Sequence, residues 1–179
     1  MKRMKLKNKD LVESAMTEFL MCASDLEYYD EQGNPHKKVP WVVDGGRFSA
    51  YTDEDDCDTP FFFISYGLDE LFYSSGTKDF RKDFVERSPK SRGFANITIS
   101  LLHELGHLET DWYDFGDYDR DTEVARVTSL PISQINREYF KLPDEAAATD
   151  WAIDWLSKKE NRIAAKNFER KFFSCFAPI

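Results

Sequence analysis

Near the start of the chain, hydrophobic residues recur at the spacing of one helix face. The stretch from residue 9 to residue 28 therefore predicts an amphipathic helix. The turn-forming residues at 30–35 predict where that helix ends. The apolar positions of the helix are Leu11, Ala15, Phe19 and Cys22.

The pattern then changes to runs of β-branched and aromatic residues. Two such runs, at residues 41–43 and 61–66, are separated by a Gly-Gly pair and by an acidic turn at residues 53–58. Runs of this kind between turn residues predict a small antiparallel sheet. The acidic turn could bind a cation, but we interpret it as a solvated loop.

The second half of the chain has the patterns of helices. Residues 68–86 offer a partly apolar helical face, and Ser88-Pro89 combines a cap residue with a first-turn proline, as at the start of a helix. Further helices are expected at 129–139 and from Pro143 through Trp155 toward Phe173. With the small sheet before them, these helices predict an α+β fold.

Length and composition favour a single folded domain over residues 1–179. The formal net charge of -9 opposes direct binding to nucleic acid, because Lys and Arg supply most of that affinity. The apolar runs are far shorter than the roughly 20 residues that cross a bilayer, and polar residues follow the basic start of the chain. We therefore expect a cytoplasmic protein without membrane contacts.

The cysteines of the chain, Cys22, Cys57 and Cys175, are odd in number and far apart, which favours reduced thiols.

A candidate metal site lies in the sequence HELGH at residues 103–107. On a helix, His103 and His107 are four residues apart and share one face, which suits two ligands of a zinc ion. Leu101, Leu105 and Leu108 fall on roughly the opposite face, so the same helix can pack into a core. We therefore expect a helix over 97–108, although Ile97-Thr98-Ile99 locally favours a strand. Two histidines and a glutamate could share a face by chance, but two of only three histidines lie in this motif.

A catalytic zinc ion normally has three protein ligands and one open position. The metzincin pattern would need glycine at position 110 and histidine at position 113, where this chain has Thr110 and Tyr113. The remaining histidine, His36, lies in an expected surface loop. Glu145 is the preferred third ligand, by analogy with sites made of two histidines and a glutamate. Weaker candidates are Glu109, Asp111, Asp121 and Asp144.

HELGH at 103–107 followed by EAAATDWA at 145–152 resembles the ImmA/IrrE family of gluzincin-like zinc metallopeptidases. In that family, HELGH is followed by a pattern of the form E-x-x-A-N/D-x-F-A. The resemblance covers roughly residues 95–157. It implies a zincin-like fold with a small sheet on the HExxH helix, and His103, His107 and Glu145 as zinc ligands. It also implies Glu104 as the general base and a helix-turn-helix repressor as the protein substrate.

Two departures from the family pattern bear on activity. Thr149 stands where the family has Asn or Asp, at a position that supports a zinc-binding histidine. The metal affinity of the site could therefore be altered, or its activity reduced. The acidic and aromatic segment 108–144 could contact substrate or be a surface excursion. Tyr113 and Tyr118 in this segment are candidates to steady the oxyanion, and an extended peptide could pair with the strand at 61–66.

The sequence thus predicts a zinc-dependent peptidase that cuts a specific protein. A non-catalytic zinc-containing protein, or an acidic interaction protein, is the main alternative. The presence of Glu104 argues against the first, because a structural zinc site needs no base. A metal-dependent hydrolase acting on a non-peptide substrate is a third hypothesis.

Overall fold

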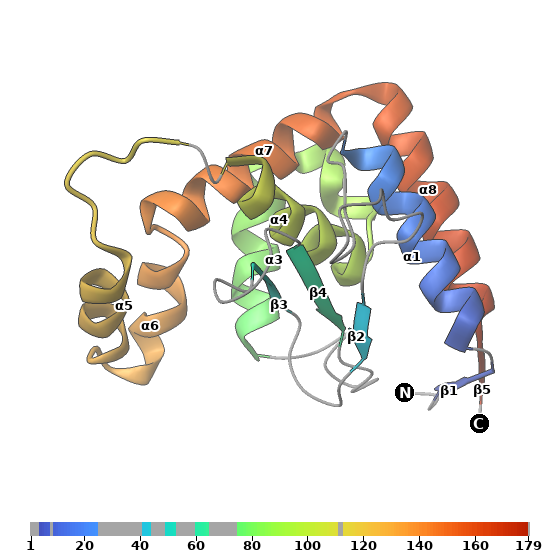
Figure 1. Ribbon diagram of the computed structural model, residues 1–179, viewed down its shortest axis with the longest axis horizontal. Coiled ribbons are helices and arrows are strands. Elements are labelled where there is room, and N and C mark those ends of the chain that lie inside the picture. The colour runs from blue at the N-terminus through green and yellow to red at the C-terminus, as the bar shows by residue number, and fades with distance from the viewer. Residues whose placement is uncertain are drawn as a thin grey trace, which may run out of the picture.

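Helices dominate the computed structural model, which describes residues 4–7, 9–24, 41–43, 49–52, 60–64, 75–110 and 113–178 (Figure 1). The described α-helices run from eight to sixteen residues, whereas the described strands have three to five. The helices are α1 (Lys9–Ala23), α3 (Ser75–Arg87), the 3-10 helix η1 (Pro89–Gly93), α4 (Asn96–Thr110), α5 (Arg120–Thr128), α6 (Ile132–Tyr139), α7 (Pro143–Ser157) and α8 (Lys159–Ser174). The strands are β1 (Met4–Leu6), β2 (Trp41–Val43), β3 (Ser49–Thr52), β4 (Pro60–Ile64) and β5 (Phe176–Pro178).

The expected α+β fold, with an antiparallel sheet on the HExxH helix, is therefore wrong, because the described part of the chain is mostly helical. The aromatic and β-branched runs form only short strands, and most of the described chain follows the helical periodicity that buries an apolar face. The order of the three-stranded sheet is β2-β4-β3, and the sheet is mixed, since β2 runs parallel to β4 and β3 runs antiparallel to it. The acidic turn at 53–58 lies outside the described residues.

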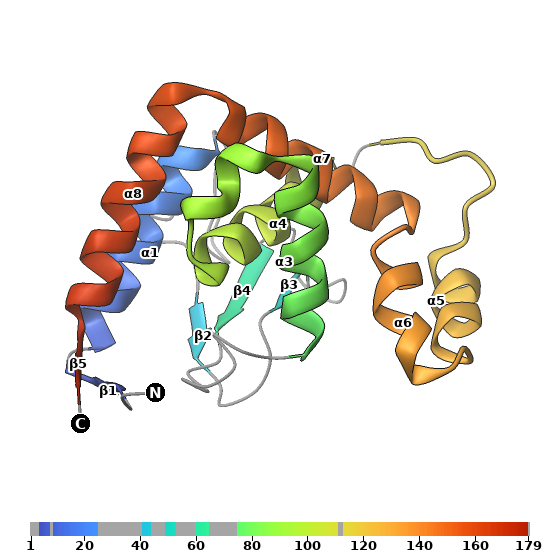
Figure 2. The same cartoon turned by 180° about the vertical axis from the view of Figure 1, so that it is seen from behind.

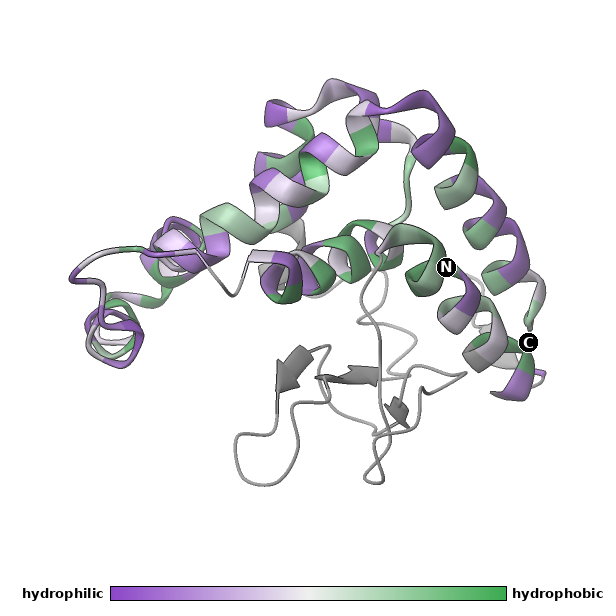
Figure 3. Ribbon diagram, turned by 45° about the horizontal axis from the view of Figure 1, so that its top comes forward, coloured by the Kyte–Doolittle hydropathy of each residue, from purple (hydrophilic) through white to green (hydrophobic). Residues whose placement is uncertain are grey.

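The two ends of the chain come together. Strand β1 pairs antiparallel with β5, and α1 lies alongside α8 (Figures 1 and 2). The rings of Phe19 and Phe168 stack at 4.4 Å between these two helices. The indole nitrogen of Trp155 donates to the carbonyl of Ala23 at 3.0 Å, which links the end of α1 to α7. Figure 3 shows how hydrophobic and hydrophilic residues alternate around these helices, as amphipathic packing requires.

Helices α4 and α7 pack closely against each other, and glycine permits their approach. A Cβ atom on Gly106 would lie 2.4 Å from the carbonyl oxygen of Ala148, so only glycine fits there without a shift of the backbone. Ala148 is itself fully buried. Small residues on both helices thus bring the two backbones into direct contact.

Several element boundaries differ from those expected. Ser88 makes no side-chain cap, and the chain forms the short 3-10 helix η1 before α4 begins at Asn96. The helix that starts at Pro143 ends at Ser157, because Lys158 has extended backbone angles and α8 begins after it. Helix α5 was not predicted, whereas the short helix after Pro131 is confirmed as α6.

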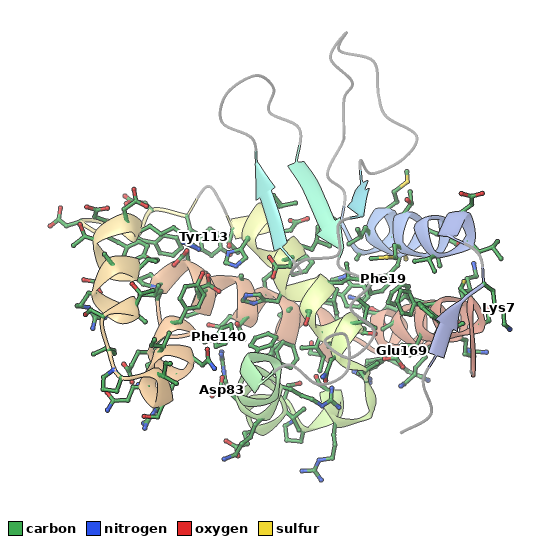
Figure 4. The ribbon with its side chains drawn as sticks, turned by 90° about the horizontal axis from the view of Figure 1, so that it is seen from below. Lys7, Phe19, Asp83, Tyr113, Phe140 and Glu169 are labelled. Atoms are coloured by element: carbon green, nitrogen blue, oxygen red, sulfur yellow. The ribbon has the colours of Figure 1, made fainter. Side chains whose placement is uncertain are left out.

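Helices α5 and α6 extend away from the other helices at one side of the molecule (Figures 1 and 2). Asp119 caps α5, since its side chain accepts hydrogen bonds from the backbone nitrogens of Asp121 and Thr122. Phe140, labelled in Figure 4, lies at the other end of this segment. Its ring stacks on that of Phe80 in α3 at 4.7 Å. Within the described stretches, no helix combines the length and the apolar composition needed to cross a bilayer.

Candidate metal centre

Helix α4 presents His103 and His107 on one face and packs into the core with another. Leu101 and Leu105 are fully buried in the hydrophobic core, and Leu108 packs against its edge. His103 is buried, whereas His107 is partly exposed. The helix forms through Ile97-Thr98-Ile99 in spite of their local strand preference, because all three side chains are buried in the packed helix.

Helix α7 brings Glu145 to the two histidines from its first turn. One carboxylate oxygen, Oε2, lies 3.1 Å from Nε2 of His103 and 3.5 Å from Nε2 of His107. Glu145 is 3% exposed, and the ligand atoms of the three residues all lie within 4.8 Å of one another. Gly106 lies between the two histidines on α4, and Ala148, which it contacts, lies about one turn after Glu145 on α7, so this close approach brings the three side chains together.

Thr149 lies one helical turn after Glu145 and contacts Nδ1 of His103, the ring nitrogen that does not face Glu145. Its hydroxyl donates to the backbone carbonyl of Glu145 at 2.8 Å and lies 3.1 Å from Nδ1 of His103. A hydroxyl has a single proton, so with that proton on the carbonyl, Oγ1 accepts a hydrogen bond from Nδ1–H. This arrangement directs Nε2 of His103 toward Glu145.

Aromatic rings fix the plane of the His103 imidazole. The ring of Phe80 lies 4.8 Å from it, and the ring of Phe140 lies 6.0 Å away in an edge-on arrangement. The imidazole of His107 is 4.8 Å away on the same helix. His103 therefore has packing partners on several sides as well as a hydrogen bond, which limits its rotation.

The second oxygen of Glu145 faces a different set of groups. Oε1 lies 3.1 Å from Nη2 of Arg120, whose Nε also contacts Oδ2 of Asp144 at 2.7 Å. The phenol of Tyr118 donates to Asp144 at 2.6 Å, and Arg120 Nη2 lies 3.3 Å from the hydroxyl of Tyr139. Sequence reasoning missed Arg120 and Tyr139. The cap at Asp119, followed by a threonine three residues later, is a signal that could have located the start of α5.

The charges at this site shift the pKa values of its members. Burial would raise the pKa of Glu145, but hydrogen bonds from His103 and His107, and their charges, hold it well below its usual range. Burial lowers the pKa of His107, but the hydrogen bond and charge of Glu145, with the charges of Glu104 and Asp144, outweigh this and raise it above 6.5. Burial is the largest cause that raises the pKa of Tyr118, followed by the hydrogen bond to Asp144 and the charge of that carboxylate. Burial also raises the pKa of Tyr139, followed by the charge of Glu145 and the hydrogen bond to it.

The three side chains fit a metal ion. Ligand atoms about 2.0 to 2.2 Å from a tetrahedral ion lie roughly 3.3 to 3.6 Å from one another. The observed separations of Glu145 Oε2 from the two imidazole nitrogens, 3.1 and 3.5 Å, are close to this range. Two imidazoles and an ionised carboxylate are also ligands that transition metals accept. The group His103, His107 and Glu145 could therefore hold a metal ion.

Other residues considered from the sequence have different surroundings. Glu104 is partly buried, and its charge helps to raise the pKa of the neighbouring His107. Glu109 accepts a hydrogen bond from Ser24, and Asp144 binds Arg120 and Tyr118. Asp121 is exposed on α5, whereas Asp111 and His36 lie outside the described residues.

The two tyrosines and the three cysteines were also considered from the sequence. The hydroxyl of Tyr118 is engaged by Asp144, while Tyr113 is 41% exposed, with its ring 6.2 Å from that of Phe115 (Figure 4). Cys22 is exposed and Cys175 is buried, both as free thiols, and Cys57 is outside the described residues.

No protein-family model, curated protein or solved structure matches this chain.

Proposed function

We propose that this protein is a zinc-dependent metallopeptidase that cuts a specific protein substrate. The observation that carries the proposal is the meeting of His103, His107 and Glu145 around one point, with Glu104 beside them on α4. A purely structural metal site has no need for a carboxylate next to its ligands. The resemblance of HELGH and EAAATDWA to the ImmA/IrrE pattern supports the same function.

This set of ligands suits zinc. Two neutral imidazoles and one carboxylate are the ligands of several catalytic zinc sites, which keep one position open. When bound, the ion would lower the pKa of a water molecule to about 7 and polarise a substrate carbonyl. His103, His107 and Glu145 would hold it.

The residues around the proposed metal site would then have the following roles. Glu104 would take the proton from the attacking water and return it to the amine that leaves as the peptide bond breaks. Thr149 would hold the ring of His103 in the orientation that presents Nε2. Phe80 and Phe140 would keep one side of that imidazole away from water.

We further propose a regulatory protease of the cytoplasm, with a repressor or another DNA-binding regulator as its substrate. A protease that cut broadly inside a cell would damage its host, so restriction to one or two exposed linkers is expected. The net charge of -9 suits this role, since a DNA-binding domain is basic and would attract an acidic enzyme.

Co-expression with repressors encoded nearby tests the proposal. The wild type should cleave one of them at one or two sites, identified by mass spectrometry of the fragments. Glu104→Gln should keep the fold and the metal but lose about 10²- to 10⁴-fold in rate, because glutamine cannot accept the proton. Glu109→Gln, on the same helix but bonded to Ser24, is the matched control and should cleave like the wild type.

The outcomes separate the alternatives. Equal cleavage by wild type and Glu104→Gln would contradict the assigned mechanism. Bound zinc with no cleavage of any tested protein or peptide would favour a non-catalytic interaction protein. Hydrolysis of small esters or amides alone would favour a hydrolase with a non-peptide substrate.

A further inference from the structure

Arg120, at the start of helix α5, places a positive charge beside Glu145, although it lies outside both the HELGH and the EAAATDWA motifs. Arg120 is the first residue of α5, directly after the cap residue Asp119. Its guanidinium spans two consecutive carboxylates at the start of α7, with Nε 2.7 Å from Asp144 Oδ2 and Nη2 3.1 Å from Glu145 Oε1. The start of α5 is thus attached to the turn that carries the ligand.

The two oxygens of Glu145 consequently have different partners. Oε2 faces the imidazoles of His103 and His107, whereas Oε1 faces Arg120. Hydrogen bonds between a guanidinium and a carboxylate are charge-assisted and directional, so they fix the rotation of the carboxylate. Arg120 thereby leaves one oxygen of Glu145 for a metal ion.

Two effects of Arg120 on a metal ion oppose each other. Its positive charge repels a cation, but its contacts hold the ligand in a binding orientation before the ion arrives. Asp144 also pairs with the guanidinium and offsets much of its charge. Since Arg120 is about half exposed, its remaining charge is further screened by water, and the orienting effect should dominate.

We infer that Arg120 is a positioning residue that makes Glu145 a one-oxygen ligand. This inference rests on the proposed metal site. It gives the segment between the two motifs a function at the site, where the sequence left substrate contact and surface excursion open.

Zinc affinity, measured by competition with a chelator, tests this role. Arg120→Gln should bind zinc about 10- to 100-fold more weakly, the usual effect of losing a residue that orients a ligand. Arg120→Lys should fall between, because it keeps the charge without the planar pair of donors. Arg126→Gln is the matched control, since Arg126 lies on the same helix but pairs with Glu123, and it should bind zinc like the wild type.

A spectroscopic measurement separates positioning from a merely structural role. With Co²⁺ in place of zinc, the visible absorption reports the number of ligands. Arg120→Gln should move that spectrum toward a higher coordination number, because Oε1 becomes available, whereas Arg126→Gln should not. If Arg120→Gln does not fold, Arg120→Lys provides the same comparison, with a smaller shift in the same direction.

The outcomes also separate this inference from the proposal on which it rests. If the wild type binds neither zinc nor Co²⁺, the metal centre itself is wrong. If the wild type binds both ions and Arg120→Gln keeps the same affinity and spectrum, only the role of Arg120 is wrong. Tighter zinc binding by Arg120→Gln would show that repulsion dominates, which would overturn the inference.

Discussion

The hydroxyl of Thr149 lies 3.1 Å from Nδ1 of His103 and donates its proton to the carbonyl of Glu145. One threonine thus connects two candidate ligands that are far apart in the sequence. In the ImmA/IrrE pattern this position has Asn or Asp, and the threonine keeps the hydrogen-bond acceptor but without a negative charge. His103 is therefore oriented as a ligand, although its imidazole gains less basicity than a carboxylate would give it.

Replacing Thr149 should weaken metal binding without removing a ligand. Thr149→Val keeps the shape but leaves Nδ1–H of the buried His103 without its acceptor, so zinc affinity should fall about 10- to 100-fold. Thr149→Ser keeps the hydroxyl and should remain near the wild type. Chelator competition measures both, and equal affinity for the valine and serine variants would show that the hydroxyl does not support His103.

Gly106 should be sensitive to the smallest enlargement. In Gly106→Ala the new methyl group would meet the backbone of Ala148, so α4 and α7 must separate, with an expected loss of about 1 to 3 kcal/mol in unfolding free energy. Such a loss lowers the melting temperature by roughly 2 to 12 °C for a chain of this size. Metal affinity should fall as well, since the two helices carry the proposed ligands.

Gly93→Ala is the control for this substitution. A Cβ atom on Gly93 meets nothing within 4 Å, so this variant should unfold near the wild-type temperature. If Gly106→Ala and Gly93→Ala are equally stable and bind zinc equally well, the close contact between α4 and α7 is not needed.

The stability of the protein should depend on pH in opposite ways with and without metal. In the metal-free protein the raised pKa of His107 means that its ion pair with Glu145 is fully present below 6.5 and is lost as pH rises through the raised value. A metal ion needs the neutral imidazole, so zinc must displace that proton. The increase in melting temperature caused by zinc should therefore grow between about pH 6 and pH 8.

Thermal unfolding at several pH values, with zinc and with a chelator, measures this dependence. The carboxyl of Glu145 has a lowered pKa and stays ionised across this window, so it should not contribute to the change. A zinc-induced increase in melting temperature that is constant from pH 6 to pH 8 would contradict the role of His107 as a ligand.

How much of the site the sequence predicted depends on how local each feature is. His103, Glu104 and His107 lie within five residues, so helical geometry alone places them together. Arg120 and Tyr139 reach Glu145 through contacts between separate helices, which no local pattern reveals. The predicted fold class was wrong because the short aromatic runs were taken to form a dominant sheet, whereas they form only short strands. The break between α7 and α8 depends on the extended backbone of Lys158, which the neighbouring residues in the sequence do not indicate.

The metal content of the purified protein tests the central claim most directly. Elemental analysis should find about one zinc per chain in the wild type and in Glu104→Gln, following the single site expected of such enzymes. Glu145→Gln should bind zinc far more weakly, by more than the roughly 100-fold typical of residues that only support a ligand. Glu123→Gln, a glutamate on the surface of α5, should match the wild type. A wild-type protein that binds no zinc, or a Glu145→Gln variant that retains it at full affinity, would contradict the proposed metal centre.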